Sequence, residues 1–169
     1  MAYPTTINFL ESSPHIGIQP INTTSTTQRH PLGTKVRAVD STYGEAEFIY
    51  LKGVASTAAG DIVLYDSKAA TTTRLVSASR GPVAIAMSAN VASQYGWYQV
   101  SGAGVASTAS AGTGAANALL ETTATDGQAT VSGDAGRKID GIICTTAQDG
   151  PGAGFTGVQM SYPAANGNT

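Results

Sequence analysis

The chain has 169 residues, of which 12% are charged and 7% are aromatic, and its formal net charge at pH 7 is −2. This length fits a single domain, and the scarcity of Lys and Arg excludes the clustered basic surface by which proteins bind nucleic acid. The strongly apolar run at residues 83–87 is far too short to cross a bilayer, and residues 1–10 lack the features of a secretory signal.

Residues 1–33 form an irregular segment that four prolines interrupt. Because proline fixes φ and removes an amide donor, this segment is neither a helix nor a central strand. Its apolar side chains would be costly to leave in water, so we expect an extended arm that lies on this domain's own body or on a neighbouring subunit. The apolar residues of the arm are Ile7, Phe9, Leu10, Ile16, Ile18 and Ile21.

Short β-prone runs, separated by turn residues, begin at residue 35. The first two runs flank a turn candidate at residues 41–44 and predict a hairpin. Turns that contain Asp, Gly or Pro separate the later runs. The expected strands of this half are residues 36–39, 45–51, 62–65, 72–76, 83–87 and 97–100.

One hexapeptide, Gly-Val-Ala-Ser-Thr-Ala, occurs twice, at residues 53–58 and 104–109. Each copy follows an aromatic-rich run that is typical of a strand, so we expect both copies to be the same kind of connector. A reused connector indicates a repetitive β scaffold, whereas catalysis requires unlike residues gathered at one point.

The second half of the chain is richer in small residues. Residues 103–117 are nearly all Ala, Gly, Ser and Thr, and we expect a long flexible excursion there. Strand character returns at residues 129–131, 138–145 and 157–161. Beyond them we expect a flexible tail at residues 163–169.

These patterns predict a mainly β protein, a compact antiparallel β-barrel or sandwich with an extended N-terminal arm. We expect three parts: the arm at residues 1–33, a β domain at residues 34–162 and the tail at residues 163–169. No convincing amphipathic helix is present, although a short helix at residues 115–122 or at residues 88–94 stays open.

The sequence shows no pattern typical of a catalytic, metal or cofactor site. His15 and His30 lie in the arm without ligands at metal spacing. Glu45 and Glu47 share a face of a predicted strand, and we interpret them as solvated residues of a strand edge that prevent unwanted pairing. Cys144 lies in an apolar run and is expected to be a buried thiol. We therefore expect no enzymatic activity, no metal and no cofactor.

Tyr95, Trp97 and Tyr98 form the densest aromatic cluster. Such residues serve as core anchors or as contacts with a partner, and core packing is the default. Because adjacent strand residues point to opposite faces, we expect one of Trp97 and Tyr98 to be buried while the other faces a partner.

Several of these runs, taken in order, resemble small head proteins of tailed bacteriophages, and the nearest match is the capsid decoration, or cement, class. The resemblance covers residues 35–109. The runs that carry it are Val36-Arg37-Ala38-Val39-Asp40, Glu47-Phe48-Ile49-Tyr50-Leu51-Lys52-Gly53-Val54, Ala59-Gly60-Asp61, Gly81-Pro82-Val83-Ala84-Ile85-Ala86-Met87 and Tyr95-Gly96-Trp97-Tyr98-Gln99-Val100-Ser101-Gly102.

The resemblance implies a β-rich virion protein that binds the outside of the phage head and holds neighbouring major capsid subunits together. It implies the major capsid protein as partner and a homotrimer on the capsid. From the net charge and the lack of a long apolar segment or secretory signal, we expect synthesis in the host cytoplasm and no nucleic-acid or membrane partner. The residues expected at a capsid or subunit interface are Ile7, Phe9, Leu10, Ile16, Ile18, Ile21, Trp97 and Tyr98.

Two other interpretations stay open. The chain is alternatively another virion subunit, from a tail tube or a head-fibre base, since such proteins are also short-stranded and lack catalytic groups. The second is a carbohydrate-binding β domain on the virion in which Trp97, together with Tyr95 or Tyr98, stacks on sugars. The poor supply of Asp and Glu outside turns weighs against sugar cleavage.

Overall fold

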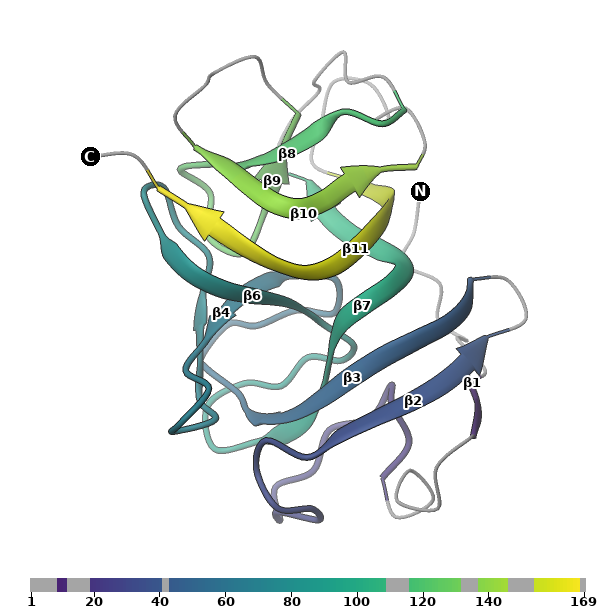
Figure 1. Cartoon of the computed structure of the whole chain (residues 1–169). Helices are drawn as coiled ribbons and strands as arrows, with labels where there is room; N and C mark the ends of the chain where they lie inside the picture. The colour runs from purple at the N-terminus through teal and green to yellow at the C-terminus, as the bar shows by residue number, and fades with distance from the viewer. Residues whose placement is uncertain are drawn as a thin grey trace.

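The computed structural model describes residues 9–11, 19–40, 43–108, 116–131, 137–145 and 154–167, with the backbone alone for residues 9–11, 105, 107 and 108. The regular elements in these ranges are all β-strands, which confirms the mainly β prediction (Figure 1). Within the same ranges, no helix is long and apolar enough to span a membrane. The strands are β1 (Phe9–Glu11), β2 (Lys35–Asp40), β3 (Gly44–Lys52), β4 (Ile62–Tyr65), β5 (Thr72–Arg74), β6 (Arg80–Ala86), β7 (Tyr95–Thr108), β8 (Leu119–Thr122), β9 (Ala129–Thr130), β10 (Lys138–Cys144) and β11 (Gly154–Asn166).

The strands form one extensive sheet that is antiparallel except where β7 meets β9. Its order is β1-β2-β3-β7-β9-β8-β10-β11-β6-β4-β5, and β7 also pairs with β6 and with β11. The sheet therefore bends back on itself around the long strands β7 and β11, as Figure 1 shows. This bending gives a sandwich-like arrangement, because a single sheet encloses apolar side chains between its own parts.

β11 changes partner along its length. Residues 154–161 pair with β7, and residues 164–166 pair with β6. Tyr162 lies between the two stretches and has a φ of +46°, in the left-handed region that non-glycine residues rarely adopt. The neighbouring strand β10 has an irregular register between Asp140 and Ile142. Irregularities of this kind bend strands, which allows β11 to cross from one partner to the other.

The predicted hairpin is present in β2 and β3, and burial along β2 alternates residue by residue. Val36 and Ala38 face the interior, whereas Lys35, Arg37 and Val39 are exposed. Alternation arises because successive strand residues point to opposite faces of a sheet. The hairpin therefore has one apolar face packed on the body and one charged face open to water.

Three clusters of buried apolar side chains stabilise the bent sheet. β3 contributes to two of them, because Phe48 and Tyr50 lie on one of its faces and Ile49 and Leu51 on the other. Burying each of these side chains is worth about 2 kcal/mol. The third cluster consists of Ile62, Leu75, Val83, Ile85, Ala106, Leu120, Ala129, Ile139, Ile142, Cys144, Val158, Met160 and Ala165.

Residues 19–33, which we expected in the arm, pack on the body of this same chain. Nε2 of Gln19 donates to the carbonyl oxygen of Tyr95 at 2.8 Å, and Oε1 of Gln19 accepts from the Tyr50 hydroxyl at 2.6 Å. Nε1 of Trp97 donates to the Gln19 carbonyl at 2.9 Å, and Ile21 lies in a core cluster. Residues 19–33 therefore lie on this chain's own body, which is one of the two places expected for the arm.

The flexible tail predicted at residues 163–169 is wrong for residues 163–167. β11 continues through Asn166, and Pro163, Ala165 and Gly167 are buried. The amide of Gly167 donates to the carbonyl of Ser79 at 2.9 Å. A pattern of small residues and Pro indicated a loose end, whereas pairing with β6 orders the segment.

Two other local predictions are also corrected. Residues 119–122 form β8, and residues 88–94 contain bends and turns, so the helix that stayed open at either place is absent from the described residues. Residues 103–108 continue β7 instead of starting a flexible excursion, because β11 pairs with them. Residues 109–115 lie outside the described ranges.

The two copies of the hexapeptide do not form the same connector. Residues 53–58 form a turn after β3, in which Ser56 has a φ of 65°. Residues 104–108 lie within β7 and pair with residues 154–158 of β11. The expectation of a duplicated connector is therefore wrong, because only the second copy has a partner strand.

A buried ion pair joins the turn before β4 to the end of β5. Nη2 of Arg74 lies 3.0 Å from Oδ2 of Asp61, whose side chain is 4% exposed, and also donates to the carbonyl of Asp126 at 2.7 Å. Burial raises the pKa of Asp61, while the amide of Ala58 and the Arg74 guanidinium lower it in part. The positive charge of Arg74 therefore offsets the cost of burying the negative charge of ionised Asp61.

Replacing Arg74 with Met should lower the free energy of unfolding at pH 7 by about 3 kcal/mol, because the substitution leaves a buried carboxylate without its cation. Because Arg74 lowers the pKa of folded Asp61, its removal should raise that pKa further, so the deficit should grow as the pH rises from the folded pKa of wild type to that of the variant and shrink below it. Urea unfolding of both proteins at pH 4 and pH 7 measures this. The double variant Arg74→Met with Asp61→Asn should recover stability at pH 7, and an equal deficit at both pH values would contradict the assignment.

Replacing Gln19 with Ala should lower the free energy of unfolding by about 2 kcal/mol, because the buried Tyr50 hydroxyl then loses its acceptor. Thermal or urea unfolding checks the value. Asn22→Ala is the matched control, because Asn22 is an exposed amide in the same segment and its loss should change stability by less than about 0.5 kcal/mol. Additive effects of Gln19→Ala and Tyr50→Phe in a double-mutant cycle would refute the coupling.

Candidate functional site

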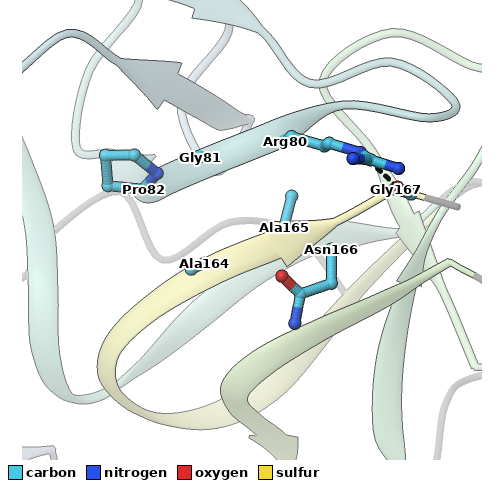
Figure 2. A pocket seen from close by; sticks show the side chains of 7 residues that line it. All are labelled: Arg80, Gly81, Pro82, Ala164, Ala165, Asn166 and Gly167. Atoms are coloured by element: carbon cyan, nitrogen blue, oxygen red, sulfur yellow. Dashed lines mark hydrogen bonds between the residues drawn. The ribbon is translucent and has the colours of Figure 1, made fainter.

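Two cavities stand out on the described part of the surface. The first, of about 500 Å³, lies between β6 and β11 (Figure 2). Figure 2 shows small side chains around it and the Arg80 guanidinium, whose Nε donates to the carbonyl of Gly167. This cavity presents few polar side chains that converge on one point. It is lined by Arg80, Gly81, Pro82, Ala164, Ala165, Asn166 and Gly167.

The second cavity, of about 350 Å³, lies between β3 and β11 at the place where both strands pair with β7. We call it the hairpin groove. Ser101 of β7 pairs with Glu47 on one side and with Ser161 on the other. Small side chains at this part of β7 leave space between the two flanking strands. The groove is lined by Arg37, Glu45, Ala46, Glu47, Ser101, Gly102, Gln159, Met160 and Ser161.

Gly102 is required where β3 and β7 approach each other in the groove. Its φ of +100° is accessible to glycine, and a Cβ at this position would lie 2.6 Å from the carbonyl oxygen of Glu45. Any side chain here would displace β3. The bottom of the groove is therefore formed by backbone that is fixed in the sheet.

Arg37 of β2 and Glu45 and Glu47 of β3 line one wall of the groove, and Lys35 lies beside that wall against Glu47. Nε of Arg37 lies 3.4 Å from Oε2 of Glu47, and its Nη1 lies 3.5 Å from Oε1 of Glu45. Nζ of Lys35 lies 3.8 Å from Oε1 of Glu47. The groove lining itself carries one cation and two carboxylates, and Lys35 beside it brings the formal net charge of the cluster to zero.

Tyr162 of β11 lies against the same charged group. Nζ of Lys35 is 4.6 Å from the centroid of the Tyr162 ring, and the Tyr162 hydroxyl donates to Oε1 of Glu47. This hydrogen bond raises the pKa of Tyr162, because it favours the neutral phenol. Tyr162 nevertheless remains 48% exposed, so a fixed aromatic ring lies at the surface beside the groove.

The structure places Trp97, Tyr98 and Ile21 in the interior. Trp97 and Tyr98 are both 0% exposed, and Ile21 is 3% exposed. The expectation that Trp97 or Tyr98 faces a partner is wrong, because each face of β7 at this point is covered by a core cluster. Burial also raises the pKa of Tyr98 to about 12, which keeps its hydroxyl neutral.

The other predicted interface residues are in the N-terminal segment. Phe9 and Leu10 belong to β1, whose backbone pairs with β2. The structure describes only the backbone of these two residues, so their expected role at an interface also stays a prediction. Ile7, Ile16 and Ile18 lie outside the described residues, so their expected role at an interface stays a prediction.

Of the histidines and glutamates considered from the sequence, Glu47 has surroundings different from those expected, whereas the Glu45 side chain is exposed as expected. His30 is buried against the rings of Tyr50 and Trp97, at centroid distances of 5.0 and 5.1 Å, and His15 lies outside the described residues. Glu47 is not a solvated edge residue, because β3 pairs with strands on both sides and the Glu47 side chain is 14% exposed. In the described ranges, no three His, Cys, Asp or Glu side chains gather as metal ligands would.

Sequence patterns did not reveal the groove or Tyr162. The contact between Glu47 and Tyr162 joins residues that are 115 positions apart. No local motif signals such a contact, because it arises from the pairing of β3 and β11 with the same strand. The unusual φ of Tyr162 likewise has no signature in the sequence.

Comparisons of this chain with protein-family models, with curated proteins and with solved structures found no match.

Proposed function

We propose that this chain is a capsid decoration protein of a tailed bacteriophage, which binds the outer surface of the head and stabilises contacts between major capsid subunits. The observation that carries the proposal is the position of β1. The N-terminal segment joins the sheet as an edge strand, with Leu10 opposite Val39 of β2. In Figure 1, β1 lies beside the end of the hairpin that extends from the rest of the sheet.

An edge strand is a suitable element for holding proteins together. Attachment through main-chain hydrogen bonds requires no specific side chain, so a strand of this kind is also able to pair with a neighbour's sheet. β1 is the terminal strand in the order of the sheet, and one of its edges meets no strand among the described residues. An open edge of this kind is where a strand of another protein adds.

The rigidity of the body also supports this proposal. Core clusters on both faces of β3 hold the hairpin firmly to β7. Residues 19–33 are tied to the same core through Gln19, so the N-terminal segment leaves the body from a fixed point. The resemblance of residues 35–109 to cement proteins adds the location on the head, the major capsid protein as partner and a homotrimer as the assembled form.

Removal of residues 1–18 should abolish binding to expanded heads that lack this protein, while the remaining chain folds. The deletion stops before Gln19 because Gln19 and Ile21 belong to the core. Cosedimentation with purified expanded heads measures binding, and circular dichroism with thermal unfolding reports the fold of the truncated chain. A synthetic peptide of residues 1–18 should compete with the intact protein for heads.

Three results would contradict the proposal. The intact protein fails to cosediment with heads, or the truncated protein binds as tightly as the intact one. The third contradicting result is that electron microscopy of the purified protein shows stacked hexameric rings or hollow tubes, which would favour a tail-tube subunit.

A further inference from the structure

We infer that the hairpin groove is a binding site for a neutral saccharide. This inference is separate from decoration of a head, because a chain with either property does not need the other. It also differs from the sugar site considered from the sequence, since Trp97 and Tyr98 are buried and no sugar can stack on them.

The groove is formed before any ligand arrives. Three strands that are hydrogen-bonded through their backbones, β3, β7 and β11, make its walls and its base. Gly102 holds the base close to β3, as described above. A site that is already shaped costs little conformational entropy on binding, which is what a weakly bound, hydrophilic ligand requires.

The chemistry of the lining fits a neutral polyhydroxylated ligand. Arg37 in the lining pairs with both Glu45 and Glu47, and Lys35 beside the groove pairs with Glu47, so these paired charges favour neither a phosphate nor a metal cation. Each hydroxyl of a sugar both donates and accepts hydrogen bonds, and the lining supplies both kinds of group. The Arg37 guanidinium donates, the two carboxylates accept, and the Gln159 amide and the Ser161 hydroxyl do both.

Tyr162 supplies the aromatic surface beside these polar groups. Its ring is held by the hydrogen bond to Glu47 and by the contact with Lys35, yet 48% of the residue is exposed. Its φ of +46° is costly for a residue with a Cβ, and strain of this kind gathers at functional sites. A ring fixed at the edge of a polar groove can cover the apolar C–H face of a sugar while the groove binds its hydroxyls.

The size of the groove limits the ligand. Its volume of about 350 Å³ is near the lower end of the roughly 300 to 1,000 Å³ typical of small-molecule sites. A groove of this size accommodates a monosaccharide or a terminal disaccharide unit. We therefore expect recognition of the end of a glycan, with a dissociation constant of about 1 mM or tighter for the isolated sugar.

The test is a screen of the intact protein on a glycan array, followed by titration of the ¹⁵N-labelled protein with the methyl glycosides of glucose, galactose, mannose and N-acetylglucosamine. At least one sugar should shift the amide signals of residues 101–102 and 159–162 in a saturable manner. If none of the array glycans and none of the four glycosides binds, or if the shifts lie elsewhere on the chain, the inference is wrong.

Two substitutions assign the binding to the groove. Gln159→Ala should weaken, by about tenfold, the affinity for the sugar that binds. The control Gln128→Ala, in the turn before β9, should leave that affinity unchanged. Tyr162→Gly removes the ring at a position where glycine adopts the positive φ without strain, so the chain should stay folded and lose sugar binding at least tenfold. Wild-type affinity in both Gln159→Ala and Tyr162→Gly would overturn the assignment.

If Tyr162→Gly unfolds the chain, Tyr162→Phe replaces it in the test. Phe keeps the ring but loses the hydrogen bond to Glu47, so it should retain sugar binding within a fewfold of wild type. Loss of binding in a folded Tyr162→Phe protein would show that the hydroxyl, and not the ring surface, matters. That result would refute the stacking role of Tyr162.

Discussion

Main-chain pairing along β7 is the constraint on which the rest of the structure depends. This strand pairs with β3, β6 and β11 and meets β9 at Thr108. Each of the three core clusters includes side chains from it: Ala106 in one, Trp97 in another, and Tyr98 with Val100 in the third. Because adjacent β7 residues point to opposite faces, one strand joins two sides of the core.

The hairpin groove follows from the same pairing. β3 and β11 flank β7 at Ser101 and Gly102, where small side chains leave the space open. Tyr162 lies beside the groove, where β11 changes partner, and its hydroxyl donates to Glu47 of the groove wall. Two polar contacts inside the protein also join different segments: Gln19 attaches the N-terminal segment to β3, and Arg74 compensates the charge of Asp61. Both the surface site and the interior thus depend on contacts between distant segments.

Local patterns were sufficient to predict most of the strands. The runs at residues 36–39, 45–51 and 62–65 became β2, β3 and β4, because β-branched and aromatic residues with turn residues at both ends favour strands wherever the chain folds. Burial of a particular side chain was harder to predict. Trp97 and Tyr98 were expected on opposite faces, and they are, but a core cluster covers each face. The groove was not predictable, because its walls come from strands far apart in sequence.

The hexapeptide at residues 53–58 and 104–109 shows what local sequence preference determines and what tertiary contacts determine. The sequence by itself determined that the chain is built from short β-strands with small residues between them, since that depends on local preference. Tertiary structure alone decided that the first copy is a turn and that residues 104–108 of the second are a strand. Identical residues have identical local preferences, so the difference comes from β11, whose backbone groups pair with one copy and not with the other.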